Sequence, residues 1–495
     1  MHSKDFGIIA LEVHFPRYYI AQTDLEVADE CIGKYTKGLE QEALGLCSVE
    51  EDISSICLTV VSNLVSRLNL NLRDVGFLEV GTETLIDKSK STKTVLMQLF
   101  EKCGNLDVEG VDVKNACFGG TAALFHALNW LESSAWDGRL ALVVAADIAV
   151  YGTKATRPTG GAGAVAMLLG PNAPLVIDPG LRVHHMEHRY DFYKPDLGSE
   201  YPRVDGKLSL RSYQDALLAC YAKYRSKVIS RGLASTVSVI TQPHPAQAAD
   251  GLGHAIDFVC FHSPFTRLVR KAFGWLALDD VRQATCVSNG EGCNGIGRSD
   301  TSRLDAAVVD SISRLVQPDS PPLDVRETDS ICMKATADLF ADRVEPGLVF
   351  ARQVGNMYTA SLYTCLASLL LSASESRLRD RRVLLYSYGS GLASAMFSLR
   401  IHQTRSLSEL CYSADSETSK DGRAMNPIFE RLLTQRTRLD MVTFEKILAE
   451  RSTLHNAAPF KPTHRPEGLF PGSYFLDDVD EQHRRVYKRM PSCQP

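Results

Sequence analysis

The fold is decided by the stretch Val113-Lys-Asn-Ala-Cys-Phe-Gly-Gly-Thr121, in which one cysteine precedes two glycines. Residues 109–113 read as a strand, and residues 121–136 carry leucines at helical spacing. This pattern predicts that Cys117 lies at the N-terminal end of a helix, where unpaired N–H groups and the helix dipole favour a thiolate. A free cysteine is often simply a buried residue. The flanking strand, glycines and helix favour a reactive thiol instead.

Strand-like and helix-like patterns alternate on both sides of Cys117, which predicts the α/β class. In the first half we expect strands at residues 6–15, 75–80, 140–146 and 164–169 and helices at residues 51–68 and 91–103. In the second half we expect strands at residues 258–261, 348–354 and 383–388, each ending at a polar site. The matching order of strand, polar site and helix suggests an internal duplication.

The length of 495 residues exceeds what one hydrophobic core usually serves. We predict an N-terminal half at residues 1–230 and a C-terminal half at residues 231–495. The second half would include peripheral insertions around residues 287–347 and a C-terminal appendage from residue 427.

Composition excludes several classes of protein. The net charge of -5 argues against a nucleic-acid surface. The 13 cysteines show neither a CxxC pair nor zinc-ligand spacing, so we expect no metal site. We find no signal peptide and no apolar run long enough to span a membrane, which predicts a cytoplasmic protein with reduced thiols.

Three chemically capable groups follow predicted strands, namely Glu83, Cys117 and His262. Ligand sites in α/β sheets lie beyond the carboxyl ends of strands, so these three side chains could meet at one site. Cysteine with histidine supports covalent catalysis, and a carboxylate adds an acid or base. This set alone is compatible with a thiol protease, an acyltransferase or a Claisen-type condensing enzyme.

Longer motifs narrow the choice. They are GTETLIDKSKS at 81–91, NACFGGT at 115–121, RPTGG at 157–161, YDFYKP at 190–195, FHSP at 261–264, GNMYT at 355–359, SYGSG at 387–391 and VDEQHRR at 479–485. With these motifs the chain closely resembles eukaryotic-type hydroxymethylglutaryl-CoA synthases of the thiolase superfamily. The resemblance covers most of the chain and weakens across residues 287–347 and 405–465.

The resemblance implies a duplicated thiolase-like fold, layered αβαβα, acting as a homodimer without a metal or redox cofactor. It implies condensation of acetyl-CoA with acetoacetyl-CoA and water to give hydroxymethylglutaryl-CoA and CoA, a step toward isoprenoids and sterols. Cys117 matches the acetylated nucleophile and Glu83 the base that removes a methyl proton. His262 matches the residue that positions acetoacetyl-CoA and assists proton transfer at its ketone.

The same resemblance implies a set of substrate-binding positions. They are Ile32, Ala155, Thr159, Ser209, Arg267, Lys271, Asn356 and Ser390. Arg267 departs from the lysine typical of animal members, but arginine keeps the charge and can bind phosphate through two hydrogen bonds. Ile32 and Ala155 match variable positions, and we expect main-chain contacts there.

Two alternatives remain beside this synthase. One is a ketoacyl synthase-like enzyme that uses a carrier-bound acyl group, although such enzymes rely on histidine and asparagine without the equivalent of Glu83. The other is a non-catalytic scaffold relative, against which the retention of Glu83, Cys117 and His262 counts.

Overall fold

The computed structural model describes residues 5–234, 237–240, 255–288, 304–316, 324–402, 408–411 and 426–492. Its central feature is a ten-stranded sheet that runs through both halves of the chain. The strands of its first part are β5 (Asp112–Val113), β4 (Val75–Gly81), β6 (Leu140–Ala149), β7 (Gly161–Gly170) and β1 (Gly7–His14), in spatial order. The second part continues with β8 (Leu175–Ile177), β14 (Ala393–Ile401), β13 (Arg382–Gly389) and β12 (Phe258–Phe261), while β9 (Val183–Met186) pairs with β14.

The two parts of the sheet repeat one topology. In the first, β4 is parallel to β6, β6 is antiparallel to β7, and β7 is antiparallel to β1. In the second, β12 is parallel to β13, β13 is antiparallel to β14, and β14 is antiparallel to β8. Antiparallel pairing of β1 with β8 joins the two sets. The repeated strand order and directions confirm the predicted duplication.

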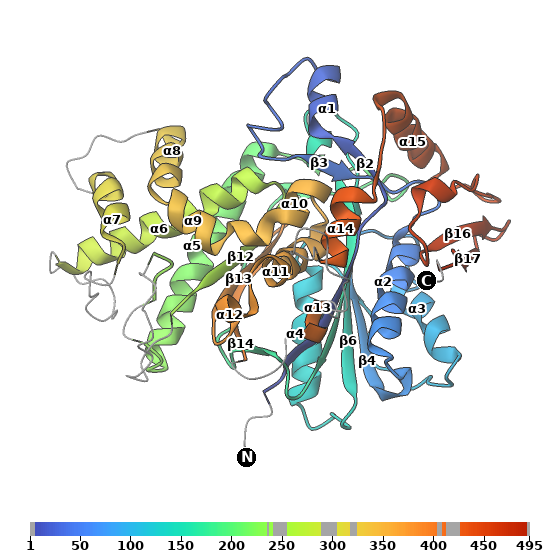
Figure 1. The fold of residues 1–495 in the computed structure, drawn as a ribbon, viewed down its shortest axis with the longest axis horizontal. Helices are drawn as coiled ribbons and strands as arrows, with labels where there is room; N and C mark the ends of the chain where they lie inside the picture. Colours follow the sequence, from blue (N-terminus) through green and yellow to red (C-terminus); the bar gives the residue numbers. More distant parts are fainter. Residues whose placement is uncertain are drawn as a thin grey trace, which may run out of the picture.

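Helices complete five layers, which Figure 1 shows side by side. The outer layer on one side holds α2 (Ile53–Leu68) and α3 (Thr92–Glu101), and the outer layer on the other holds α5 (Gly206–Ser230) and α6 (Thr266–Ser288). The middle layer holds α4 (Gly119–Glu132) and α11 (Ser361–Ser372). Alternate residues of β6 face the two neighbouring layers: Val143 packs in the core with α4, and Val144 packs in the core with α2 and α3. The fold is therefore α/β, layered αβαβα as expected.

The strand predicted at residues 348–354 is wrong, because this segment forms helix α10 (Val349–Val354). Phe350, Ala351 and Val354 are buried at helical spacing, and a short apolar run does not distinguish a buried strand from a buried helix. Gly355 ends the helix at a φ of 85°, in the left-handed region that glycine adopts readily. The strand predicted at residues 109–113 is also shorter than expected, with only β5 and a bridge between Glu109 and Phe77.

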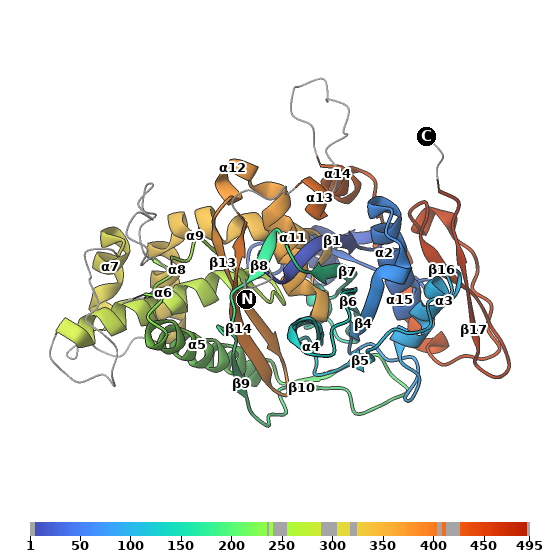
Figure 2. The same cartoon turned by 90° about the horizontal axis from the view of Figure 1, so that it is seen from below.

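The segment predicted as an appendage packs on the N-terminal half (Figure 2). Its elements are α14 (Pro427–Thr434), β15 (Thr437–Arg438), α15 (Met441–Leu454), β16 (Tyr474–Val479) and β17 (Arg485–Arg489). Strand β15 pairs with β2 (Tyr18–Ala21), which pairs with β3 (Ala43–Gly45). The Tyr474 N–H donates to Thr59 of α2 at 2.8 Å. The division of the chain at residue 230 stays a prediction.

The segment predicted as a peripheral insertion also contributes to the core. Its described elements are α7 (Ala306–Ile312), α8 (Val325–Ala335) and α9 (Ala337–Arg343). Asp329 of α8 is buried and accepts a hydrogen bond from the Trp275 indole of α6 at 2.7 Å. The remaining short elements are α1 (Gln22–Ala28), β10 (Phe192–Tyr193), β11 (Arg203–Val204), α12 (Glu375–Leu378) and α13 (Ser408–Cys411).

A close backbone crossing joins the end of β4 to the start of α4. A side chain at Gly81 would place its Cβ 2.4 Å from the nitrogen of Gly120 and 2.5 Å from the carbonyl carbon of Gly119. Both neighbours are backbone atoms, which cannot move aside without shifting the helix. The glycines at residues 81, 119 and 120 therefore bring the two site-bearing segments, residues 82–84 and 115–118, next to each other.

We predict that Gly81→Ala lowers the free energy of unfolding by about 1–3 kcal/mol, because overpacking here must displace α4. The urea midpoint and Tm measure the change. Gly206→Ala is the control, since a Cβ at Gly206 meets no heavy atom within 4 Å. Equal stability of the two variants would contradict the close crossing.

Candidate active site

Cys117 lies in a tight turn between β5 and α4. The N–H of Phe118 donates to the Asn115 carbonyl at 3.0 Å, and the N–H of Gly119 donates to the Ala116 carbonyl at 3.3 Å. Ala116 has a φ of 45°, a left-handed conformation that costs a residue other than glycine about 1–2 kcal/mol. Strain of this kind concentrates at functional sites. The turn presents the Cys117 side chain beside the N-terminus of α4, as predicted.

The structure brings Glu83 to Cys117. The Cys117 thiol donates to Oε1 of Glu83, with 3.6 Å between sulfur and oxygen. The other carboxylate oxygen, Oε2, lies 3.2 Å from Nζ of Lys194. The Glu83 side chain is only 7% exposed, so these two contacts take place largely out of water.

Asp147 of β6 fixes the loop that carries Glu83. Its Oδ1 accepts hydrogen bonds from the hydroxyl of Thr82, the N–H of Glu83, and the N–H and hydroxyl of Thr84, all at 2.8–3.0 Å. Its Oδ2 accepts from the N–H and hydroxyl of Thr359 at 3.0 and 2.5 Å. Thr359 also donates to the Gly81 carbonyl at 3.0 Å. One fully buried carboxylate therefore ties the Glu83 loop to the second half of the chain.

Aromatic side chains surround the sulfur. Cys117 and Phe192 pack against a small cluster that contains Tyr151 and Tyr358. The Tyr358 ring meets the Tyr151 ring edge-on at 6.3 Å and the Phe192 ring at 5.8 Å. These rings cover one side of the Cys117–Glu83 pair and lower its contact with water, which strengthens its electrostatic interactions.

The electrostatics differ from the expectation of a thiolate favoured by the helix dipole. Burial, together with the carboxylates of Glu83 and Asp147, raises the pKa of Cys117 well above its usual range. Burial also raises the pKa of Glu83, although the Lys194 charge opposes this shift. In the resting protein the proton therefore stays on sulfur, and Glu83 is placed to accept it.

A cleft opens at this site. It has a volume of about 310 Å³, in the range of ligand-binding pockets. Its lining includes Glu83, Lys194 and Ser390, together with the neighbours of Cys117, Asn115 and Ala116. The Asn115 amide donates to the Ser390 carbonyl at 3.4 Å, so the turn after β13 closes against the nucleophile turn.

His262 follows β12 and is buried. Burial lowers its pKa to about 3, which keeps the imidazole neutral. Its Nδ1 has no hydrogen-bond partner among the described residues. The Tyr213 hydroxyl donates to its carbonyl at 2.9 Å, and the Tyr213 ring packs at 5.1 Å from Tyr388 of β13. No contact among the described residues joins His262 to Cys117 or Glu83, so its place at the site stays a prediction.

Asn356 lies on the turn between α10 and α11, beside Thr159. Its N–H donates to the Gly160 carbonyl at 3.2 Å, and its side-chain oxygen accepts from the Tyr358 N–H at 2.9 Å and the Ser361 hydroxyl at 3.1 Å. The Asn356 side chain therefore caps the turn before α11.

The remaining predicted substrate positions cluster on segments that bind one another. The loop at residues 29–40, with Ile32 76% exposed, contacts the turn that holds Ala155 through a 2.6 Å bond from Arg157 to Asp29. Its other end binds α6, because Glu40 accepts from Arg267 at 2.9 Å. Ser209 lies separately, in the first turn of α5.

Carboxylates already pair with the two predicted phosphate-binding cations. Glu40 lies 2.9 Å from Arg267 and also 3.0 Å from Arg270. Lys271 pairs with the buried Asp329 at 2.9 Å. A phosphate would add to these pairs or replace the Glu40 contact.

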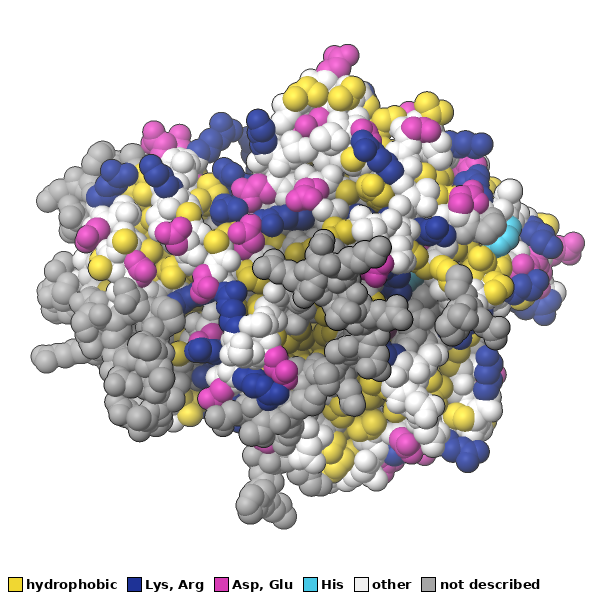
Figure 3. Space-filling model, in the orientation of Figure 1, with side chains coloured by type: hydrophobic (Ala, Val, Ile, Leu, Met, Phe, Trp, Pro, Cys, Tyr) yellow, Lys and Arg dark blue, Asp and Glu magenta, His cyan; other side chains and the backbone are white. Residues whose placement is uncertain are grey.

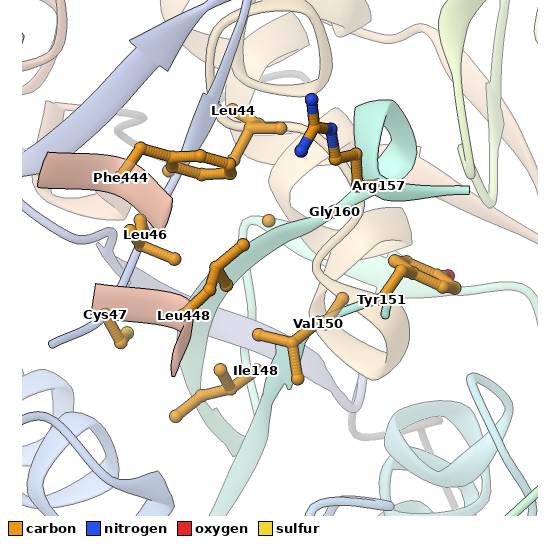
Figure 4. A pocket seen from close by; sticks show the side chains of 13 residues that line it. Leu44, Leu46, Cys47, Ile148, Val150, Tyr151, Arg157, Gly160, Phe444 and Leu448 are labelled. Atoms are coloured by element: carbon orange, nitrogen blue, oxygen red, sulfur yellow. The ribbon is translucent and has the colours of Figure 1, made fainter. Parts of the chain in front are cut away.

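A small apolar cavity, drawn in Figure 4, lies between β3, the end of β6 and α15. Phe444 and Leu448 of α15 line it beside Leu46, and Tyr151 lies at its edge. Its volume of about 10 Å³ holds at most one water. The C-terminal helix therefore supports the strand end that carries Tyr151.

Sequence reasoning missed Asp147, Lys194 and Tyr358. A lone acidic residue within the apolar run 140–150 was the available signal for Asp147. Lys194 and Tyr358 lie inside quoted motifs, but nothing in their spacing marks them as neighbours of Cys117.

Fold and site together define a thiolase-like α/β enzyme with a half-buried cysteine–glutamate pair. Family models for hydroxymethylglutaryl-coenzyme A synthase match the chain, the N-terminal model over residues 2–174 and the C-terminal model over residues 175–490. The cytoplasmic hydroxymethylglutaryl-CoA synthase of Gallus gallus is 46% identical, covering 99% of this chain and 88% of the relative. The mitochondrial enzyme of Mus musculus is 44% identical, covering 99% and 90%. The solved structure of MvaS in complex with 3-hydroxy-3-methylglutaryl coenzyme A aligns with a TM-score of 0.75 at 27% identity, covering 98% and 99%.

The chain therefore belongs to the hydroxymethylglutaryl-CoA synthase family. This membership sets aside the ketoacyl synthase alternative. Within the described part of the chain, no helix is both long and apolar enough to cross a membrane, and no three His, Cys, Asp or Glu side chains are grouped to hold a metal ion.

We predict that alkylation of Cys117 by iodoacetamide accelerates with rising pH up to at least about pH 9, because burial and two carboxylates hold the proton on sulfur. Mass spectrometry of the Cys117 peptide measures the rate. A rate that reaches its plateau below about pH 7 would show that the helix dipole, rather than burial, determines the pKa of Cys117.

Proposed function

We propose that this chain condenses acetyl-CoA with acetoacetyl-CoA and water to give hydroxymethylglutaryl-CoA and CoA, in the route from acetyl units to isoprenoids. The observation that carries the proposal is the half-buried Cys117–Glu83 pair beside the cleft. Release of free CoA and formation of hydroxymethylglutaryl-CoA by the purified protein test it. Product formation from a carrier-bound acetyl group but not from acetyl-CoA would contradict it.

In the first step, the Cys117 thiol passes its proton to Glu83, and the sulfur attacks the acetyl carbonyl. The carbon–sulfur bond to CoA then breaks, and the CoA thiolate leaves with that proton. Because the pKa of Cys117 is raised, this assistance speeds the attack, and the 3.6 Å contact supplies it.

In the second step, Glu83 removes a proton from the methyl group of the acetyl-enzyme. The resulting carbanion attacks the ketone carbon of acetoacetyl-CoA. The neutral His262 imidazole donates a hydrogen bond to the ketone oxygen as it becomes an alkoxide, and the alkoxide takes up the proton that Glu83 removed from the methyl group. Water finally hydrolyses the Cys117 thioester and releases the product.

The substrate positions are assigned within the same proposal. Asn356, Ser390, Thr159 and Ser209 hold the acyl end, while Arg267 and Lys271 hold CoA phosphate; Ile32 and Ala155 contribute main-chain contacts. No metal or redox cofactor takes part, because thioester condensation requires only a base and hydrogen-bond donors. In Figure 3, acidic and basic side chains are interspersed on the visible face, which agrees with a small-molecule substrate rather than nucleic acid.

The protein is proposed to act as a cytoplasmic homodimer. Support for dimer formation comes from β5, which forms the edge of the sheet. Beside this strand, Val111 is 60% exposed. Tyr190 and Leu197 on the loop beside the cleft are exposed as well. Sedimentation of the purified protein measures its mass. Relatives include both cytoplasmic and mitochondrial forms, and cell fractionation decides the compartment.

Glu83→Ala should separate the two steps. A nearby base only assists acetylation, whereas condensation needs it to remove a carbon-bound proton, a contribution of roughly 10²–10⁴-fold. We expect slower but complete formation of acetyl-enzyme and almost no hydroxymethylglutaryl-CoA. A single-turnover experiment with labelled acetyl-CoA measures both.

The control for this variant is Glu132→Ala, at the far end of the helix that begins beside Cys117. Its kinetics should match those of the unaltered protein. Normal condensation from the Glu83→Ala acetyl-enzyme would remove Glu83 from the mechanism.

Arg267→Ala should raise the KM for a CoA substrate several-fold with little change in kcat, which is the sign of lost uniform binding. Arg270→Ala is the matched control, because it breaks a contact to the same Glu40 on the same helix. Steady-state kinetics at low salt compare the two. Equal KM values in both variants would remove Arg267 from the phosphate site.

A further inference from the structure

Lys194 makes an unusual set of contacts at the reactive centre. Its Nζ lies 3.2 Å from Oε2 of Glu83 and 4.8 Å from the centre of the Tyr358 ring. The Phe192 ring lies 5.8 Å away. A cation over an aromatic ring is attracted by the electrons of the ring face, more strongly where water is excluded. The lysine side chain is 19% exposed, so its position is fixed by these contacts more than by solvent.

The segment around Lys194 is held in place by contacts with both halves of the chain. Strand β10, which directly precedes Lys194, pairs with β11. The buried Asp191 accepts from the Gly391 N–H at 2.8 Å and from the Tyr388 hydroxyl at 2.9 Å, which attaches this hairpin to β13 and the turn after it. Pro195 further restricts the backbone of Lys194.

We propose that Lys194 is a positioning residue for Glu83, holding one carboxylate oxygen so that the other faces the sulfur and the acyl group. The assignment rests on the function proposed above. The two carboxylate oxygens of Glu83 have different partners, since Oε2 contacts the ammonium group and Oε1 contacts the thiol. A carboxylate free to rotate would offer either oxygen to either partner, and misplacement of a base by about 1 Å can cost about 10²-fold in rate.

The charge of Lys194 also affects the pKa of Glu83. Burial raises the pKa of Glu83, and the ammonium group lowers it, so Lys194 preserves the ionised base. The groups that face Glu83 are Cys117, Asp147, Tyr151, Tyr358 and Lys194, and the cleft adds Lys114, Asp196, Glu200 and His455. Asp147 opposes Lys194 by raising the pKa of Glu83.

Lys194→Met removes the charge and keeps most of the side-chain length. We expect the acidic limb of the kcat profile to move up by roughly 1–3 pH units, the range for loss of an adjacent opposite charge. The KM for both substrates should change little. Lys194→Arg should return the limb to within about half a unit, because it restores the cation.

Lys488→Met is the matched control, since Lys488 pairs with Asp477 at 3.0 Å on the hairpin of β16 and β17. This variant loses a more exposed lysine–carboxylate pair and should keep the pH profile of the unaltered protein. Loss of activity in Lys194→Met by one factor at every pH, with no shift of the limb, would overturn the proposal.

A measurement without substrate separates this proposal from the proposed reaction. The Lys194 charge also lowers the pKa of Cys117, so Lys194→Met should move the pH dependence of Cys117 alkylation by iodoacetamide to higher pH. An unmoved alkylation profile in the folded variant would overturn the role of Lys194 even if the unaltered protein makes hydroxymethylglutaryl-CoA. A moved profile together with no product from the unaltered protein would support Lys194 and contradict the proposed reaction.

Discussion

The buried carboxylate of Asp147 holds the active site together. It accepts hydrogen bonds from Thr82, Glu83 and Thr84 on one oxygen and from Thr359 on the other. These donors come from the loop after β4 in the first half and from the turn before α11 in the second. A buried charge is tolerated only when it is fully hydrogen-bonded, and such a site fixes its donors in turn. The position of Glu83 beside Cys117 therefore depends on Asp147.

The duplication explains why the site lies where it does. The turn after β13 in the second half packs on the turn that holds Cys117 in the first half. Gly389 shows how tightly these turns pack, because a Cβ at this position would lie 2.5 Å from the Asn115 carbonyl oxygen. Cys117 and Glu83 come from the first half, while His262, Asn356 and Ser390 come from the second. Under the proposed function, one half alone would lack the donors at the ketone.

Much of the fold could be predicted from periodicity, because β6, β7 and β12 are apolar runs bounded by glycine or polar residues. The helical segment at residues 349–354 could not, since a buried helix and a buried strand share that composition. Of the site, Cys117 and Glu83 could be placed at neighbouring strand ends. The protonated state of the thiol could not, because it depends on burial and on Asp147 and Lys194, which approach Cys117 only in three dimensions.

The central claim is that Cys117 carries the acetyl group during turnover, and mass spectrometry tests it most directly. The purified protein is incubated with acetyl-CoA alone and digested, and acetoacetyl-CoA is then added to a second sample. The account predicts one acetyl group on the Cys117 peptide in the first sample. In the second sample it predicts loss of that group with matching formation of hydroxymethylglutaryl-CoA. An acetyl group on another residue, or one that acetoacetyl-CoA does not discharge, would contradict the account.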